Sequence, residues 1–156
     1  MPTIINNTPA CLIPKELFNK EKIQEYWNVL HPHTHQEHLG KDDIGNYFLL
    51  YPKPNEGDAM HDICFMYNKL QKKYPQQSHS ICINVYDDGF NILACKESDV
   101  VYAGHFSFSV KEDVLYHLTN ISQQYYENIS QVKYYYQQLP HTILRLLNHY
   151  YEMKKL

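Results

Sequence analysis

Hydrophobic residues recur along the chain with two different periods, one typical of helices and the other of strands. Apolar positions three and four residues apart predict four amphipathic helices, at residues 19–30, 58–74, 110–125 and 141–156. Asn19 is a candidate cap for the first helix, and Pro75 ends the second. Ser109 and Glu112 predict a capping box at the start of the third.

Short apolar runs bounded by proline or turn residues predict the strands. These runs are "ACLIP" at 10–14, "YFLLYP" at 47–52, "SICINVY" at 80–86, "FNILAC" at 90–95, "VVYAGHFSF" at 100–108 and "QVKYYYQ" at 131–137. The Asp-Gly pair at 88–89 is a strong hairpin signal, so the three runs between 80 and 108 predict an antiparallel meander. The stretches 31–46 and 53–58 are rich in polar and turn residues and are expected to be loops.

The expected order of elements is β-α-β-α-β-β-β-α-β-α. A three-stranded antiparallel meander followed by α-β-α is the topology of the ribonuclease-H-like fold, which actin-like ATPases use twice. We therefore predict one α/β domain over residues 1–156, with a mixed sheet covered by helices. Residues 11–75 supply its β-α-β-α part and residues 80–156 its β-β-β-α-β-α part. The chain shows no internal repeat, low-complexity tract or linker.

Composition and charge exclude several classes of protein. The chain has 156 residues, of which 44% are hydrophobic and 20% charged, so it is long enough to bury a real core. A formal charge of −3 gives no electrostatic reason for a nucleic-acid partner, which needs a basic face. No run approaches the roughly 18 apolar residues of a membrane span, and "MPTIINNTPACLIP" lacks the features of a signal peptide. We expect neither a nucleic-acid nor a membrane partner.

The cysteine content indicates the cellular compartment, and the tyrosine content indicates a property of the surface. The four cysteines are widely spaced and form no C-x-x-C pair: Cys11, Cys64, Cys82 and Cys95. This favours a reduced, cytoplasmic protein. The chain contains 15 tyrosines and one tryptophan. Tyrosine suits half-exposed interfaces, although an AT-rich coding sequence explains the same enrichment.

Several longer segments carry a resemblance to a known family. They are "CLIPKELF", "FMYNKLQKKYPQQSHS", "FSFSVKEDVLYHLTNISQQYYENI" and "QVKYYYQQLPHTILRLLNHYYE". The chain from about Cys11 onward resembles an uncharacterised bacterial group, domain of unknown function 3822. The most telling part is the apolar strand that runs into the acidic "EDVLYHL" helix.

The resemblance implies a divergent actin-like ATPase fold of the ribonuclease-H-like type, and no biochemical activity comes with it. Relatives usually carry an additional β-rich segment before the equivalent of "CLIP", whereas ten residues precede it here. We therefore expect a shortened member, or one that completes this half through a partner or a second copy.

The turn in "YDDGFN" is the candidate nucleotide site. Actin-like ATPases cradle phosphates with glycine-rich hairpins, in which backbone N–H groups approach the oxygens and a carboxylate holds the metal. Asp87, Asp88 and Gly89 stand in the corresponding hairpin and would hold ATP with Mg²⁺. However, no Ser or Thr follows the glycine, and neither a second phosphate hairpin nor a glycine-rich adenosine loop is recognisable. A plain hairpin turn is the favoured interpretation.

A nuclease of the ribonuclease-H type finds less support. That chemistry needs two metals clamped by carboxylates from the first strand, a helix and a later strand. Asp87 and Asp88 follow the first meander strand, and Glu112 and Asp113 begin a helix, but "QVKYYYQ" offers no carboxylate. Glu112 and Asp113 are better explained as cap and helix-dipole partners.

The stretch "HPHTHQEH" is the candidate metal site. His33 and His35 would point to the same side of an extended chain, and His31 or His38 could complete a tetrahedral zinc site. Pro32 and the polar composition indicate a mobile loop, and flexible loops make weak, unselective metal sites. A polar loop is therefore the favoured interpretation of this stretch.

These observations favour a non-catalytic protein-binding or assembly module on a degenerate actin-like fold, with no cofactor and no catalytic residue. Its partner is expected to be another protein or a second copy of the chain. An ATPase that loses its phosphate-binding loops but retains its sheet can become a scaffold. There are two alternatives. One is a divergent nucleotide-dependent ATPase with its site at Asp87, Asp88 and Gly89, and the other is a protein that binds a metal through residues 31–38.

Overall fold

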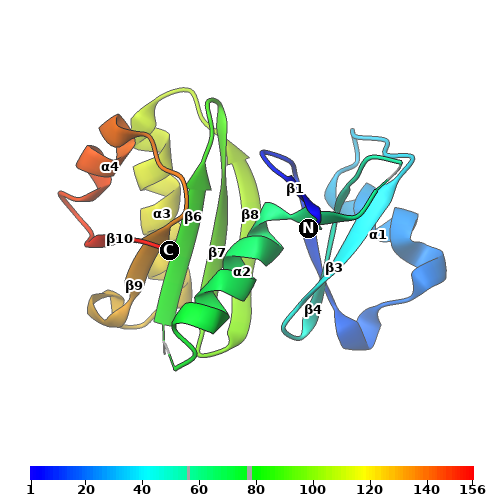
Figure 1. The fold of residues 1–156 in the computed structure, drawn as a ribbon, viewed down its shortest axis with the longest axis horizontal. Helices are drawn as coiled ribbons and strands as arrows, with labels where there is room; N and C mark the ends of the chain where they lie inside the picture. Colours follow the sequence, from blue (N-terminus) through cyan, green and yellow to red (C-terminus); the bar gives the residue numbers. More distant parts are fainter. Residues whose placement is uncertain (56, 77–78) are drawn as a thin grey trace.

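Five strands from the second half of the chain form one mixed sheet in the order β10-β9-β6-β7-β8 (Figure 1). The computed structural model describes residues 1–55, 57–76 and 79–156. The strands are β6 (His79–Val85), β7 (Gly89–Lys96), β8 (Asp99–Ser107), β9 (Lys133–Tyr136) and β10 (Met153–Lys155). β6, β7 and β8 are antiparallel neighbours, which confirms the predicted meander. β9 is parallel to β6, and β10 is parallel to β9.

The two central meander strands are buried on both faces, so they read as nearly continuous apolar runs. Successive side chains of a strand point to opposite faces of its sheet. In β6, Ile81 and Ile83 therefore join one hydrophobic cluster, and the intervening Cys82 joins another. The register pairs Val85 with Phe90, which leaves residues 86–89 to make the turn.

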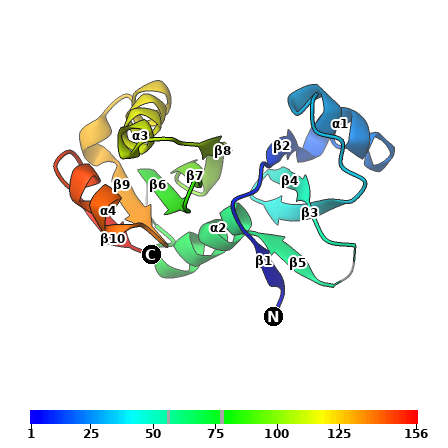
Figure 2. The same cartoon turned by 90° about the horizontal axis from the view of Figure 1, so that it is seen from above.

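Helices cover both faces of this sheet. α3 (Lys111–Tyr125) and α4 (His141–Leu147) lie on one face, and α2 (Asp62–Lys73) lies on the other (Figure 2). The cluster on the α3 side includes the fully or nearly fully buried Ile81, Ile83, Val85, Phe90, Ile92, Val114, Leu118, Ile121, Ile143 and Leu147. The predicted α/β class, with a meander followed by α-β-α, is confirmed.

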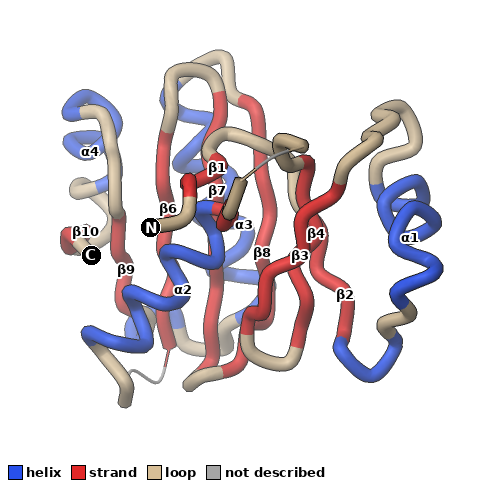
Figure 3. The backbone as a smooth tube through the Cα atoms, turned by 45° about the vertical axis from the view of Figure 1, so that its right-hand side comes forward, coloured by secondary structure: helices blue, strands red, loops and turns tan. Residues whose placement is uncertain are grey.

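A second, antiparallel sheet of three strands is built from the first half of the chain. Its strands are β2 (Cys11–Pro14), β4 (Tyr47–Pro52) and β3 (Leu39–Ile44), in the order β2-β4-β3. α1 (Ile23–Leu30) lies beside this sheet (Figure 3). Its Trp27 packs against Cys11 and Ile13 of β2 and Leu50 of β4. β1 (Thr3–Ile5) and β5 (Ala59–His61) form a separate parallel pair. Short 3-10 helices cover Lys15–Leu17, Lys20–Lys22 and Ile129–Gln131.

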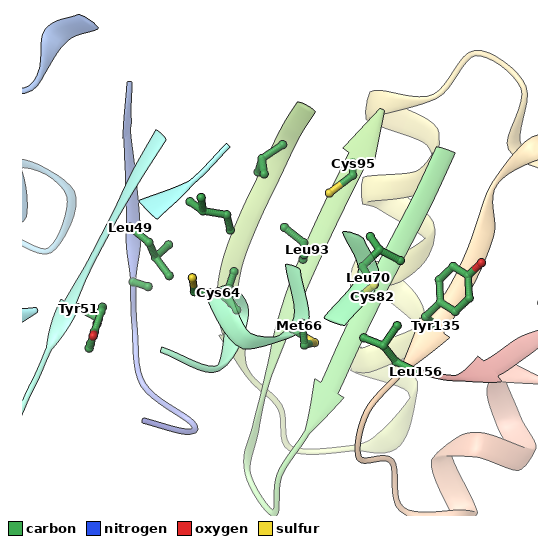
Figure 4. Packing of buried hydrophobic residues seen from close by; sticks show 14 residues of the cluster. Leu49, Tyr51, Cys64, Met66, Leu70, Cys82, Leu93, Cys95, Tyr135 and Leu156 are labelled. Carbon is green, nitrogen blue, oxygen red and sulfur yellow. The ribbon is translucent and has the colours of Figure 1, made fainter. Parts of the chain in front are cut away.

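α2 is buried between the two sheets. Its Ile63, Met66 and Leu70 are at most 1% exposed. The same hydrophobic cluster includes Leu49 from β4 and Leu93 from β7 (Figure 4). One core thus joins residues from both halves of the chain through a single helix.

Two strands of the first half were missed: β3, which forms a hairpin with β4 through the two-residue turn Gly45-Asn46, and β5, whose partner β1 is distant in sequence. Residues 39–44 were expected to be a loop, but they pair with β4 along their whole length. Residues 59–61 were expected to begin a helix, but they pair with β1, and the helix starts at Asp62. The predicted loop at 53–58 is confirmed for its described residues, and Glu56 lies outside them.

The last predicted helix and the predicted capping box also need correction. α4 ends at Leu147, and the chain returns as β10, with Met153 opposite Tyr134 of β9. At the start of α3 the capping acid is Asp113 rather than Glu112. Its Oδ2 accepts hydrogen bonds from the N–H groups of Ser109 at 2.9 Å and Val110 at 3.2 Å. The observed order is β-β-α-β-β-β-α-β-β-β-α-β-α-β.

Leu93→Ala tests the core that α2 shares with the sheet. Leu93 is fully buried in this cluster, so we expect its truncation to lower the free energy of unfolding by about 2–5 kcal/mol. Urea denaturation measures the change. Tyr116→Ala is the control, because Tyr116 is 62% exposed and its loss should cost less than about 0.5 kcal/mol. Equal losses in the two variants would contradict the packing described.

Candidate functional site

The turn between β6 and β7 carries the residues that the sequence proposes for a nucleotide. Asp87 and Asp88 are exposed, and Gly89 is buried as the first residue of β7. The turn is closed by a hydrogen bond from Tyr86 N to Gly89 O at 2.8 Å. Phe108 N donates to Asp88 O at 3.0 Å, which ties the turn to the segment after β8. The structure therefore brings the three residues together in one rigid turn.

The loop between β1 and β2 lies directly against this turn. Asn7 Nδ2 donates to Asp88 Oδ1 at 2.8 Å, and Asn7 has a left-handed φ of 48°. A Cβ atom on Gly89 would overlap Asn7 Oδ1 and lie 2.9 Å from His105 Cε1. Gly89 is thus needed for the close approach of the protein's own side chains. The Asp88 carboxylate is hydrogen-bonded to Asn7. In a phosphate-binding hairpin, a carboxylate at this position would hold a metal ion instead.

A buried polar network lies beside the turn, where α2 begins. Asp62 is fully buried. Its carboxylate accepts hydrogen bonds from Asn84 Nδ2 at 2.8 Å, Tyr86 Oη at 2.7 Å and Asn91 Nδ2 at 3.1 Å. Three neutral donors replace the water that the carboxylate loses on burial. With both oxygens engaged in this way, Asp62 is placed to hold the helix against the hairpin.

His105 of β8 extends the network toward the surface. Asn91 donates its amide N–H to Asp62, so its Oδ1 accepts from His105 Nδ1 at 2.9 Å. Burial lowers the pKa of His105, and the nearby Asp88 partly opposes this effect. Burial likewise raises the pKa of Tyr86, whose hydroxyl therefore remains a donor to Asp62. The network is a chain of oriented neutral donors around one carboxylate.

The sequence analysis missed this network, although it contains one signal for it. Asn84 and Asn91 interrupt two apolar strands at positions that the hairpin register places opposite each other. A pair of amides in the middle of a buried strand pair indicates a polar group on the covering helix. That group, Asp62, is 22 residues away from Asn84 in sequence, and only the tertiary structure brings the two together.

His61 caps α2 and ties the first loop to it. His61 Nδ1 accepts a hydrogen bond from Ile63 N at 3.1 Å. The proton must then be on Nε2, which donates to Thr8 O at 3.0 Å. Both bonds need this neutral tautomer. Burial lowers the pKa of His61 from 6.5 to about 4, so the neutral form is retained well below neutral pH.

The histidine stretch 31–38 is a surface loop between α1 and β3. His31 stacks on Trp27, with 4.2 Å between ring centroids, and burial lowers its pKa. Trp27 Nε1 donates to Thr34 O at 2.9 Å, which anchors the loop to the helix. His33, His35 and His38 are exposed. Within residues 1–55, 57–76 and 79–156, no group of three or more His, Cys, Asp or Glu side chains is placed to hold a metal. Zinc binding by this loop stays a prediction.

The molecule has several hollows on its surface, and two of them lie beside the helices α1 and α4. One, of about 650 Å³, lies beside α1 and is lined by Ile13, Leu17, Asn19, Lys22, Glu25, Tyr26, Val29 and Leu30. We call it the α1 groove. The other, of about 260 Å³, lies between α3 and α4 and is lined by Lys111, Thr142, Arg145, Leu146 and His149. Asp87, Asp88 and Gly89 line neither hollow.

Comparison with protein families identifies the class of this chain. Residues 50–136, more than half of the chain, match the family described as "Protein of unknown function (DUF3822)". The chain therefore belongs to this family, and the resemblance inferred from its sequence is confirmed. The matched region runs from the end of β4 to the end of β9 and so includes α2, the meander and α3.

A solved structure shows the same fold. It is a crystal structure from Bacteroides thetaiotaomicron VPI-5482, described as a protein with an actin-like ATPase fold and unknown function. The TM-score is 0.79 at 14% sequence identity, and the match covers 98% of the present chain but 66% of the other. The chain thus has an actin-like ATPase fold and spans about two thirds of the length of this structural relative.

No curated protein sequence is significantly similar to the chain. In the described part of the chain, the longest helices are too short or too polar to cross a lipid bilayer.

His61→Asn tests the neutral imidazole at the start of α2. In the unfolded state, His61 becomes protonated below about pH 6.5. In the folded state, it stays neutral down to about pH 4. Stability is therefore highest above pH 6.5 and falls as the pH drops through this window, by roughly 3 kcal/mol for this group. Asn retains a capping acceptor but has no titrating proton, so the pH dependence should become shallower.

Urea denaturation between pH 4 and 7 measures this effect. His33→Asn is the matched control, because His33 is exposed in the loop and its removal should leave the pH dependence unchanged. A His61→Asn variant with the same pH dependence as the original chain would contradict the assigned tautomer and its burial.

Proposed function

We propose that this chain is a non-catalytic assembly module that self-associates through the α1 groove. One observation carries the proposal: Leu17, Val29 and Leu30 are 66%, 78% and 52% exposed and line the same hollow. Apolar side chains that gather around a groove, rather than scatter over a surface, mark interaction sites. The groove volume of about 650 Å³ accommodates several aliphatic side chains.

The shape and charge of the α1 groove suit a second copy of the chain. Val29, near the end of α1, lines the hollow together with Leu17 and Tyr26 and is 78% exposed. A patch that combines exposed apolar side chains with a hollow can be self-complementary, as a two-fold interface requires. Lys22 and Glu25 lie on the same rim, 3.6 Å apart. Two antiparallel copies can exchange these charges across the two-fold axis without a net repulsion.

One edge strand of each sheet offers a poorer route to assembly. β10 carries Lys154 and Lys155 on one edge of the five-stranded sheet, and β3 carries Lys41, Asp42 and Asp43 on one edge of the three-stranded sheet. Charged side chains on edge strands disfavour strand addition. Strand addition at β10 or β3 is therefore less well supported than side-chain packing at the α1 groove.

The non-catalytic part of the proposal rests on the turn at residues 86–89. Its Asp88 carboxylate is held by Asn7, and the space next to Gly89 is filled by Asn7 and His105. In addition, the buried Asp62 has hydrogen-bond donors on both oxygens. These internal contacts favour a scaffold over a nucleotide site at Asp87, Asp88 and Gly89.

Val29→Lys tests the assembly proposal. A lysine in the last turn of α1 suits the helix dipole, but it places two like charges at the centre of the proposed dimer. We expect the original chain to sediment as a dimer and the variant as a monomer at the same concentration. Tyr116→Lys is the control, because Tyr116 is similarly exposed on α3 and lies outside the groove. It should remain a dimer.

Sedimentation equilibrium on chelator-treated protein, repeated with Mg-ATP and with zinc, separates the alternatives. A dimer that is indifferent to both additions and is lost only in Val29→Lys supports the proposal. A chain that is monomeric at all concentrations contradicts it. A change of mass only with Mg-ATP would favour a nucleotide site at the Asp88 turn. A change only with zinc would favour the histidine loop.

A further inference from the structure

The hollow between α3 and α4 is lined by hydrogen-bond donors and lies apart from the α1 groove. Thr142 and Arg145 are three residues apart on α4, and His149 follows in the turn after the helix, so all three line the same hollow. The opposite side of α4 buries Ile143 and Leu147 in the core. Lys111, the first residue of α3, completes the rim from the neighbouring helix. Packing of α4 against α3 therefore sets the positions of all four side chains.

The polar side chains of this hollow can all donate to an anion. Lys111 offers an ammonium group, Arg145 a planar guanidinium with five N–H groups, His149 a ring N–H and Thr142 a hydroxyl. Arg145 is the one arginine of the chain. In the described part of the chain, neither Lys111 nor Arg145 has an acidic partner within salt-bridge distance.

The acidic residues beside Lys111 are directed elsewhere. The Asp113 carboxylate accepts hydrogen bonds from Ser109 N and Val110 N at the start of α3. These bonds lower its pKa and keep it ionised at the cap. Neither Asp113 nor Glu112 lines the hollow. Two cations thus share a small concave site without a carboxylate between them.

We propose that this hollow binds the phosphoryl dianion of a small phosphomonoester. A guanidinium fork matches two phosphoryl oxygens, and an ammonium group and a hydroxyl can engage the third. The volume of about 260 Å³ is below the usual range for a drug-sized ligand. This size favours a phosphoryl group with a short substituent over a whole nucleotide. The site is independent of the proposed self-association, because it shares no residue with the α1 groove.

A titration of the complete chain with inorganic phosphate and with phosphoserine tests the proposal. Amide chemical shifts are followed by NMR in phosphate-free buffer, with sodium chloride added to hold the ionic strength constant. We expect saturable shifts at residues 111, 142, 145 and 149. Saturation by both compounds supports the proposal, whereas saturation by inorganic phosphate alone overturns it, because the ester is then excluded. Shifts that do not saturate, or that chloride reproduces, overturn the proposal.

Variants of Arg145 separate a specific site from general attraction of anions. Arg145→Gln should weaken binding about tenfold or more, because it removes charged hydrogen bonds. Arg145→Lys keeps the positive charge but loses the two-pronged guanidinium. Its affinity for phosphate should lie between those of Arg145→Gln and the original chain. Lys72→Gln, an exposed lysine at the end of α2, should bind as the original chain does. Equal weakening in Arg145→Gln and Lys72→Gln overturns the proposal.

Discussion

The burial of α2 between two sheets is the interaction on which the rest of the structure depends. Ile63, Met66 and Leu70 contribute to one hydrophobic cluster with residues of the three-stranded and the five-stranded sheet. Each fully buried side chain of this size contributes about 1.5–3 kcal/mol. The helix is also the covalent link from the first sheet to the second, so its packing determines where the two halves of the chain meet.

The start of α2 adds a directional constraint to this hydrophobic packing. Asp62 is fully buried, and a buried carboxylate is costly unless donors surround it. Asn84, Tyr86 and Asn91 supply those donors only if the hairpin lies at the first turn of the helix. The same arrangement places Asn7 on the Asp88 carboxylate. The actin-like fold is retained here with its hairpin engaged by internal contacts.

The two proposed binding surfaces lie on the outer sides of the two halves. The α1 groove is apolar, and its two rim charges are paired with each other. The hollow at Arg145 is small and cationic. Both are made by helices that bury one face and leave the other exposed, as is usual when α/β layers end at the surface. The proposed scaffold thus uses its covering helices for recognition.

Local sequence patterns determined much of the architecture, because period-2 and period-3.6 patterns reflect burial within a single element. They predicted the meander, the helices α1 and α3, and the fold class. They did not predict β3, although only the two-residue turn Gly45-Asn46 separates it from its partner β4. They could not predict β5 or β10, which exist because of partners that are distant in sequence. The site residues Asp87, Asp88 and Gly89 were visible as a turn, but their engagement by Asn7 was not. The burial of Asp62, the exposure of Val29 and the meeting of Lys111 with Arg145 were decided by the tertiary structure, since each depends on how separate elements pack.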